Sequence, residues 1–378
     1  MEVLFNPFID VGYRGPQYFC DREGETELLI NYIRNKTNTT LFAFRRLGKT
    51  GLIKHVFHKL KKEKNIACIY VDIQGTNNKN DFINQLATSI YNTFPEKTNI
   101  GATIIKAIKS LSPTIQFDAL TGQPSVSIIT SHIAEQQNTI SSLLQFIDKQ
   151  NIQVVFAIDE FQQILSYPEK NIEAILRTEM QQLTNTSFIF CGSNQNMMHE
   201  IFNSAKRPFF ASCTYLHLDY INDKKYAHFI KRTYDKHNKT ISNEAVEFIC
   251  TWTMRHTFYT QYLCNAIFSK YNTDINLTKV KETASDIISI QEGKFYQYRN
   301  LLTASQWKLL KAIAKEERLT KPHSKELILK YAIGTSSMVS RGIDSLLKKE
   351  MILHNTGVET PYYEVYDKFL MRWLQNKY

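Results

Sequence analysis

Residues 43–50 read AFRRLGKT and form the sharpest local signal in the sequence. It follows an apolar run over residues 40–44 that predicts a β-strand, and it opens a run with helical periodicity over residues 50–61. At such a junction, successive backbone N–H groups and the N-terminus of the helix converge on one anion. The stretch therefore predicts a phosphate-binding loop between a buried strand and a helix.

The side chains of this loop suit ATP and Mg²⁺. Gly48 lets the backbone approach the phosphates, Lys49 reaches the β and γ phosphates, and the Thr50 hydroxyl is a ligand for Mg²⁺. The usual pattern has glycine at the position of Ala43, and an isolated Gly-Lys-Thr also occurs by chance, so the loop needs support from elsewhere. The candidate nucleotide-binding residues in the loop are Arg45, Arg46, Leu47, Gly48, Lys49, Thr50 and Gly51.

A second predicted strand, residues 154–158, ends in Asp159 and Glu160. In a parallel sheet, a carboxylate at this end of a strand faces the crevice where ligands bind. We expect Asp159 to bind Mg²⁺ directly or through water, and Glu160 to orient and deprotonate the attacking water. Glu160 and Lys49 are thus candidate catalytic residues. The alternative is a strand that simply runs into a charged loop.

A third predicted strand, residues 188–191, leads into Gly192, Ser193 and Asn194. We expect this strand to lie between the strands that carry Lys49 and Asp159. Ser193 or Asn194 then lies near the γ-phosphate as a polar sensor. A plain exit from a strand into a turn has the same composition, so both interpretations stay open.

The order of elements predicts an α/β domain with a parallel sheet over residues 1–218. Further strands are predicted at residues 66–72 and 214–218, and helices at residues 81–94, 135–149 and 171–183. Residues 113–128 alternate on both sides of Thr121-Gly122, which predicts a β-hairpin insertion. Helical periodicity over residues 219–296 then predicts a helical lid. Three helices and two short strands over residues 297–378 predict a winged helix.

Composition limits the class of protein. The formal net charge is +10, and the chain from residue 295 onward holds 14 basic and 8 acidic side chains, which fits either a polyanionic partner or a solvated basic surface. The six cysteines show no paired spacing, which favours reduced thiols and a reducing compartment. No leader pattern and no long apolar run is present, so we expect a cytoplasmic protein without a membrane partner.

Taken in order, these motifs make the sequence resemble the archaeal-type ATPase family, a branch of the STAND group within the AAA+ class. The resemblance covers about the first 220 residues, and the order of the motifs is more specific than any one of them. The residues that carry it are Asn6-Pro7-Phe8, Phe19, Arg22-Glu23, Glu25, Arg45 to Thr50, Phe117-Asp118, Thr121-Gly122, Asp159-Glu160 and Cys191-Gly192-Ser193.

The resemblance implies a slow, switch-like ATPase that couples ATP and ADP states to a protein partner or a homo-oligomer. It also implies that Arg22 and Glu23 contact the nucleotide pocket, although structural salt bridges are an equal alternative. Relatives carry an arginine after a Pro-aromatic-aromatic sequence, whereas here Arg207 precedes the proline and is a candidate γ-phosphate contact or a structural residue. The usual Gly-x-Pro of the lid is absent, and Arg255 or His256 is a candidate replacement.

The winged helix leaves a second function open. In such a domain the third helix enters the major groove, which exposes Ser336, Ser337, Ser340 and Arg341 to duplex DNA through residues 297–378. The alternative is a module that binds protein or inhibits its own chain, since one arginine and Asp344 make a thin basic face. A scaffold that has lost hydrolysis is a third possibility, and intact Lys49, Thr50, Asp159 and Glu160 argue against it.

Overall fold

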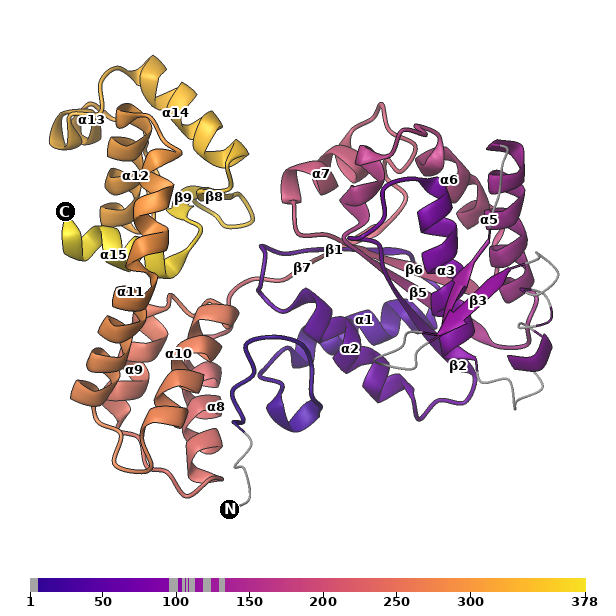
Figure 1. Cartoon of the computed structure of the whole chain (residues 1–378), viewed down its shortest axis with the longest axis horizontal. Coiled ribbons are helices and arrows are strands. Elements are labelled where there is room, and N and C mark those ends of the chain that lie inside the picture. Colours follow the sequence, from indigo (N-terminus) through magenta and orange to yellow (C-terminus); the bar gives the residue numbers. More distant parts are fainter. Residues whose placement is uncertain are drawn as a thin grey trace. The chain divides into compact units, whose positions relative to one another are not determined.

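The computed structural model describes residues 6–94, 101–103, 106, 108, 113–117, 124–128 and 133–378. The chain divides into two compact units. The first comprises Gly12–Asp219, and the second comprises Tyr220–Tyr378 together with the start of the chain up to Val11 (Figure 1). Among the described helices, none combines the length and the apolar character needed to cross a membrane.

The first unit is built on a five-stranded parallel sheet in the order β2-β5-β6-β1-β7. Strands β1 and β6 are buried at every position, as expected for strands of a parallel sheet covered on both faces. Strand β6 lies between β5 and β1, so the predicted order of these three strands is confirmed. The strands are β1 (Thr39–Phe42), β2 (Ile66–Asp72), β5 (Gln153–Asp159), β6 (Thr186–Cys191) and β7 (Thr214–His217).

Helices cover both faces of this sheet. Helix α1 packs on α2, whereas α5 packs on α3 and α6, and Figure 1 shows α1 and α2 on the opposite face from α5, α6 and α7. Sequence periodicity predicts four of these helices, α2, α3, α5 and α6, with shifted ends, but it misses α1 and α7. The helices are α1 (Glu23–Arg34), α2 (Lys49–Leu60), α3 (Lys79–Thr93), α5 (Ile133–Asp148), α6 (Ile172–Gln182) and α7 (Gln195–Asn203), with short 3₁₀ turns at Pro16–Tyr18 and Phe161–Ser166.

The predicted insertion is a β-hairpin fastened to α3. Strands β3 (Thr114–Phe117) and β4 (Pro124–Ser127) pair in antiparallel register. Two α3 side chains hold the hairpin: Val126 N–H donates to Thr88 Oγ1 at 2.8 Å, and Ile128 N–H donates to Asn84 Oδ1 at 2.7 Å. Asp118 and the expected turn at Thr121-Gly122 lie outside the described residues.

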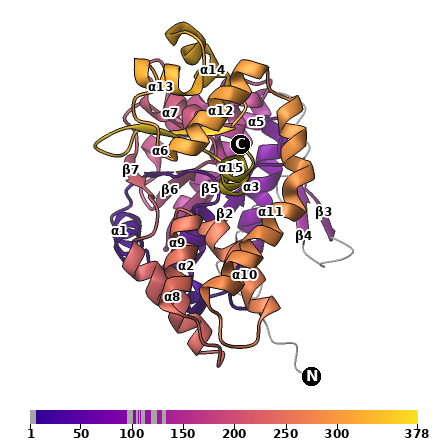
Figure 2. The same ribbon diagram turned by 90° about the vertical axis from the view of Figure 1, so that its left-hand side faces the viewer.

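The second unit begins with four helices: α8 (Asp223–Asp235), α9 (Asn243–Trp252), α10 (Thr257–Lys270) and α11 (Leu277–Asn300). Phe8, from the start of the chain, packs against Phe229, Tyr234 and Phe268 in this group. Helix α11 runs through residue 296 without a break, so the expected boundary between lid and winged helix falls inside a helix. Figure 2 shows α11 running from the α8 to α10 group toward the rest of the unit.

The remainder of the unit has the expected winged-helix order of three helices and a hairpin, followed by one helix more. The elements are α12 (Ala304–Glu316), α13 (Lys325–Tyr331), α14 (Ser336–Lys348), β8 (Ile352–Asn355), β9 (Tyr362–Val365) and α15 (Lys368–Lys377). Helix α15 was not expected. Every residue from Lys368 to Leu374 is buried, including the basic residues Lys368 and Arg372.

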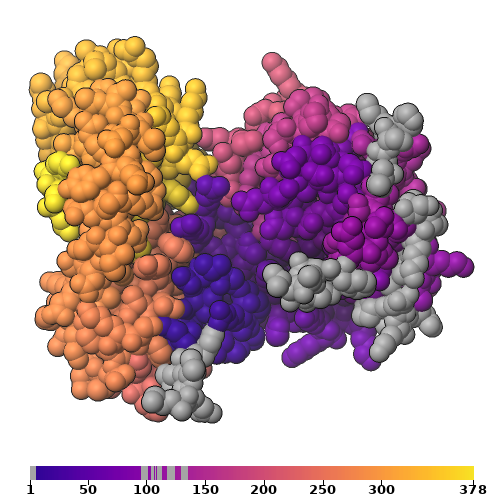
Figure 3. All heavy atoms as spheres, in the orientation of Figure 1, coloured from indigo at the N-terminus to yellow at the C-terminus, as the bar shows by residue number. Residues whose placement is uncertain are grey.

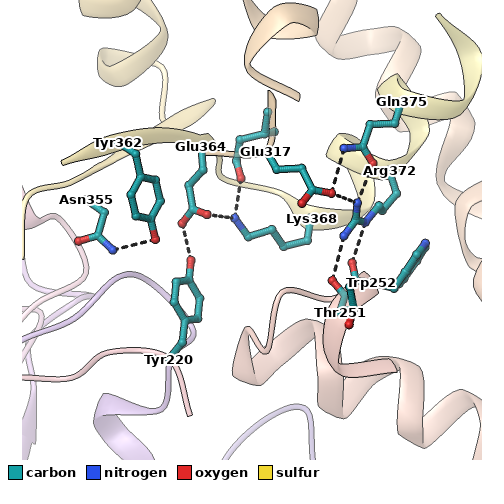
Figure 4. Close-up of polar contacts among 11 residues, drawn as sticks. Tyr220, Thr251, Trp252, Glu317, Asn355, Tyr362, Glu364, Lys368, Arg372 and Gln375 are labelled. Carbon is teal, nitrogen blue, oxygen red and sulfur yellow. Dashed lines mark hydrogen bonds and ion pairs between the residues drawn. The ribbon is translucent and has the colours of Figure 1, made fainter. Parts of the chain in front are cut away.

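A buried polar network joins α15 to both ends of the unit (Figure 4). The Glu364 carboxylate forms an ion pair of 2.9 Å with Lys368, and neither side chain is exposed at all. The Tyr220 hydroxyl donates to the same carboxylate. Arg372 donates to the carbonyls of Thr251 and Trp252 at the end of α9, at 2.9 and 2.8 Å. Helix α9 and the winged-helix region therefore pack together within one unit.

Candidate nucleotide-binding site

The phosphate-binding loop connects β1 to α2, and its backbone explains its sequence. Gly48 has a φ of 98° and Arg46 a φ of 62°, so the chain turns through the left-handed region at both positions. Helix α2 begins directly afterwards at Lys49. Ala43 is buried and does not have a positive φ, so this position does not require glycine. The side chains of Arg45 and Arg46 are exposed, whereas Leu47 is buried.

The Lys49 side chain folds back onto the backbone of the phosphate-binding loop. Its ammonium donates to the carbonyl oxygens of Ala43, at 3.1 Å, and Phe44, at 3.3 Å. The side chain is buried, and this burial lowers the pKa of Lys49 despite the nearby acids Asp159 and Glu160. A buried ammonium held only by carbonyl oxygens has capacity for an anion.

Asp159 ends β5 and accepts hydrogen bonds from four donors. Oδ2 accepts from the Thr50 hydroxyl at 2.7 Å and from the Tyr70 hydroxyl at 2.5 Å. Oδ1 accepts from the Glu160 N–H and from the Cys191 thiol, both at 3.0 Å. The carboxylate thus connects β5 with α2, β2 and β6.

Glu160 is held by the strand next to it. Its backbone has a φ of 56°, a left-handed conformation that costs a residue with a side chain about 1–3 kcal/mol. Oε2 accepts from Ser193 N–H at 3.2 Å, Ser193 Oγ at 2.7 Å and Gln162 Nε2 at 2.5 Å. The strained backbone turns the carboxylate toward the end of β6.

Gly192 allows this close approach. A Cβ at this position would lie 2.0 Å from Gln162 Oε1 and 2.8 Å from Met198 Sδ, so any larger residue displaces Gln162. Of the two candidate sensors, Ser193 contacts Glu160, whereas Asn194 caps α7 by accepting from Met197 N–H at 3.1 Å. Ser193 therefore contacts the candidate catalytic carboxylate, whereas the Asn194 side chain is engaged in capping α7.

Arg207 is paired elsewhere in the first unit. Its guanidinium forms ion pairs with Glu173, at 2.8 Å, and with Glu200, and no described contact joins it to the phosphate-binding loop. In the second unit, Arg255 pairs with Asp223 at 3.0 Å, and His256 is fully buried. Arg207 and Arg255 are thus engaged in ion pairs, and a contact of these three residues with nucleotide stays a prediction.

The segment before α1 packs on the first unit beside α2, and Figure 3 shows it at the surface in indigo. Arg22 is buried, pairs with Glu25 at 2.8 Å and donates to the carbonyl of Asp219. Phe19 stacks on His55 with 4.2 Å between ring centroids, and it lies close to Gly51 in the first turn of α2. The segment before α1 therefore forms a wall at the N-terminal end of α2.

Three residues of this constellation are not among the predicted site residues: Tyr70, Gln162, and Cys191, which the sequence offers only as part of the family resemblance. Tyr70 lies on β2, and its contact with Asp159 depends on the register that pairs β2 with β5. The only sequence signal was a polar aromatic residue in an otherwise apolar strand, two positions before its end. Burial raises the pKa values of Tyr70 and Cys191, so both remain protonated donors to Asp159.

Comparison with known families identifies the first unit. The family described as an ATPase domain predominantly from Archaea matches residues 19–254. The chain belongs to this ATPase family. A second family, a probable winged helix domain, matches residues 293–376. No curated protein sequence matches the chain.

Solved structures share the fold of this archaeal-type ATPase. A Walker-type ATPase of Pyrococcus abyssi is 16% identical with a TM-score of 0.66, and the match covers 98% of this chain and 99% of that one. The ORC2 protein of Aeropyrum pernix is 11% identical with a TM-score of 0.58, covering 98% and 96%. The ORC1 protein of Aeropyrum pernix, solved in complex with DNA, is 12% identical with a TM-score of 0.51, covering 96% and 94%. At these identities the likeness shows the fold alone.

The oxygen donors of this ATPase site fit Mg²⁺ and ATP. Magnesium prefers carboxylate and hydroxyl oxygens and keeps several waters, so a protein supplies only one or two ligands. Thr50 and Asp159 offer such a pair, with their oxygens 2.7 Å apart. Within the described part of the chain, no cluster of three or more His, Cys, Asp or Glu side chains forms a separate metal site.

Proposed function

We propose that this chain is a Mg²⁺-dependent ATP-binding and hydrolysing switch, and that it couples its nucleotide state to a protein partner or to its own assembly. The observation that carries the proposal is the convergence of Lys49, Asp159 and Glu160 at one edge of the sheet, joined by Thr50 and Ser193. Membership of an ATPase family supports the same conclusion.

Each residue has a distinct role in this proposal. Backbone N–H groups of residues 45–51 and the Lys49 ammonium bind the phosphates. Thr50 and Asp159 hold Mg²⁺, which when bound neutralises charge on the β and γ phosphates. Glu160 accepts a proton from water as the water oxygen bonds to the γ-phosphorus. The bond from that phosphorus to the bridging oxygen breaks, and ADP departs with the electron pair.

The resting contacts of Glu160 give the switch its physical basis. Oε2 of Glu160 already accepts three hydrogen bonds, from Gln162 and from the backbone and hydroxyl of Ser193. The γ-phosphate oxygens of ATP compete for the Ser193 hydroxyl, and this competition frees Glu160 for the water. Hydrolysis is then slow until the nucleotide and the partner have rearranged the end of β6.

Nucleotide binding tests this proposal. Titration of the full chain with ATP and Mg²⁺ gives a saturable signal. The Lys49→Ala substitution weakens the affinity for ATP by about 100-fold or more. Lys59→Ala is the matched control, because Lys59 is an exposed lysine on the same helix. Equal affinity of the folded Lys49→Ala protein and the wild type would remove the site assignment.

Duplex DNA is a second candidate partner, suggested by the winged-helix match. The exposed face of α14 offers Ser336, Ser337, Ser340 and Arg341, but Asp344 on the same helix is also exposed, and the wing carries the exposed Glu359. Lys368 and Arg372 are engaged inside the unit. This distribution favours a protein partner. A salt-dependent complex with duplex DNA that Arg341→Ala weakens would reverse the order of the two candidates.

A further inference from the structure

A polar pocket opens in the first unit beside the nucleotide site. Its volume is about 700 Å³, and it lies between the start of α3, the loop after β2 and hairpin strand β4. Figure 1 shows α3 and the hairpin next to β2 at this side of the sheet. The volume is within the range of sites that hold small molecules or peptide side chains. The lining includes Asp72, Asp81, Gln74, Gln85, Ser125 and Ser127.

The walls of this pocket are fixed by hydrogen bonds. Thr88 and Asn84, which also line it, use their side chains to hold the backbone of β4. Thr76, at its floor, bonds to the Tyr167 hydroxyl at 2.5 Å and is buried. The hairpin therefore forms one wall of the pocket, and hydrogen bonds to α3 hold this wall in place.

The pocket carries negative charge without an opposite charge in its lining. Asp72 accepts one backbone bond from Gln74 N–H at 3.0 Å, and Asp81 accepts one from Asn77 N–H at 2.9 Å. Neither carboxylate forms an ion pair with a described residue, and the described residues of the lining include no lysine, arginine or histidine. The nearest cation acting on Asp72 is Lys54, whose ammonium lies over the Tyr70 ring, 5.1 Å from its centroid. Each carboxylate thus keeps free acceptor positions.

The electrostatics of Asp72 favour a cationic ligand. Asp72 is exposed at the rim, and its partial burial raises its pKa, which the Gln74 N–H opposes and the negative charges of Asp159 and Glu160 reinforce. A group whose charge is disfavoured in this way gains most from an arriving cation. The amides and hydroxyls around it supply further acceptors for N–H donors.

From the cavity, its lining and its uncompensated carboxylates, we infer that this pocket binds an organic cation through a guanidinium or ammonium group. A planar guanidinium fits best, because its five N–H donors can bond carboxylate, amide and hydroxyl oxygens at once. The group comes either from a small cationic metabolite or from an arginine side chain of a protein partner. Both sources present the same chemistry.

The position of the pocket links the ligand to the ATPase site. Asp72 is the register partner of Asp159 at the ends of β2 and β5. A cation at Asp72 therefore makes the electrostatic potential around Asp159 and Glu160 less negative. This change alters the affinity of the site for Mg²⁺. This coupling rests on the proposed function, whereas cation binding does not.

Calorimetric titration of the full chain without nucleotide tests the binding itself. The probes are agmatine, a free guanidinium compound, and a capped tetrapeptide with one arginine. We expect binding at about 50 mM salt that weakens at about 300 mM. The double variant Asp72→Asn, Asp81→Asn keeps both backbone hydrogen bonds, removes both charges and weakens binding by about tenfold or more. Glu27→Gln, an exposed acid on α1, is the control and leaves affinity unchanged.

The outcomes separate the two sources. Tighter binding of the peptide than of agmatine indicates a partner side chain, and equal binding indicates a free small cation. Absence of binding by both probes, or equal affinity of the folded double variant and the wild type, overturns the inference. Because nucleotide is omitted, a failed ATPase assay would leave this result standing, and the reverse also holds.

Discussion

The Thr50 hydroxyl donates a hydrogen bond of 2.7 Å to Oδ2 of Asp159, which joins the phosphate-binding loop directly to the end of β5. In a P-loop site these two oxygens are the ones that meet Mg²⁺. Here Oδ2 also accepts from Tyr70 at 2.5 Å. The metal therefore has to compete with a second hydroxyl for the same oxygen.

Tyr70→Phe removes that competitor and keeps the ring. We predict that the Mg²⁺ concentration for half-maximal ATP hydrolysis falls about fivefold, the equivalent of one hydrogen bond of about 1 kcal/mol. Tyr167→Phe is the control, because its hydroxyl bonds to Thr76 instead. A higher Mg²⁺ requirement in Tyr70→Phe would show that Tyr70 positions Asp159 for the metal.

Gly192→Ala places a methyl group where Gln162 Oε1 lies, at 2.0 Å. We predict a loss of stability of about 1–3 kcal/mol from this overpacking, and a fall in ATP hydrolysis because Gln162 no longer positions Glu160. Gly24→Ala is the control, since a Cβ there meets nothing within 4 Å, and helix propensity predicts a gain of about 0.5–1 kcal/mol. An unchanged rate of ATP hydrolysis in Gly192→Ala would show that Gln162 does not position Glu160 for the reaction.

Lys368→Met leaves the Glu364 carboxylate buried without its partner. We predict a loss of about 3–5 kcal/mol in the unfolding free energy of the second unit. The double variant Lys368→Met, Glu364→Leu recovers most of it. All three tryptophans, Trp252, Trp307 and Trp373, lie in this unit, so fluorescence during urea unfolding reports on it alone.

The matched control for this pair is Lys270→Met. Lys270 pairs with Asp286 at 2.8 Å, but the two side chains are 42% and 58% exposed, so the expected loss is below about 1 kcal/mol. Equal losses from Lys368→Met and Lys270→Met would mean that burial adds nothing to the Glu364 pair.

His55 makes the stability of the first unit depend on pH. Burial, with help from Lys59 and His58, lowers the pKa of His55 to about 4, from 6.5 in a free side chain. Between these values the unfolded chain binds a proton that the folded chain does not, so stability rises with pH across this window and is lost as pH falls. Partial solvation limits the effect to roughly 1–2 kcal/mol.

His55→Phe keeps a ring against Phe19 and removes the titrating group. We predict that thermal unfolding followed by circular dichroism shows a smaller loss of stability between pH 6.5 and pH 4 than in the wild type. An identical pH dependence in the two proteins would assign the effect to other groups.

The sequence predicts the parallel sheet and the site motifs because their evidence is local. Asp159 and Glu160 stand at the end of one apolar strand, Lys49 and Thr50 follow the loop after another, and strand ends meet at one edge of a parallel sheet. The partner of Arg207 is not local: Glu173 lies 34 positions earlier, and nothing in the pattern around Arg207 indicates that pair. The contacts of Asp159 with Tyr70 and Cys191 likewise depend on strand order, which periodicity does not contain.

The helical ends of the chain show a similar limit. Helix α14, with one polar face, follows from periodicity, whereas α15 buries Lys368 and Arg372 together with its apolar residues and was missed. Helix α7 has only nine residues, too few to establish a period. Its cap, Asn194, was instead interpreted as a candidate sensor.

Hydrolysis by Glu160→Gln tests the central claim most directly. The amide keeps the shape of the side chain but cannot accept the proton of the attacking water. We predict that the variant binds ATP and Mg²⁺ as tightly as the wild type. Its rate of phosphate release is lower by about 100-fold or more. Phosphate release at the wild-type rate by the folded variant would contradict the account, because Glu160 would then not be the base.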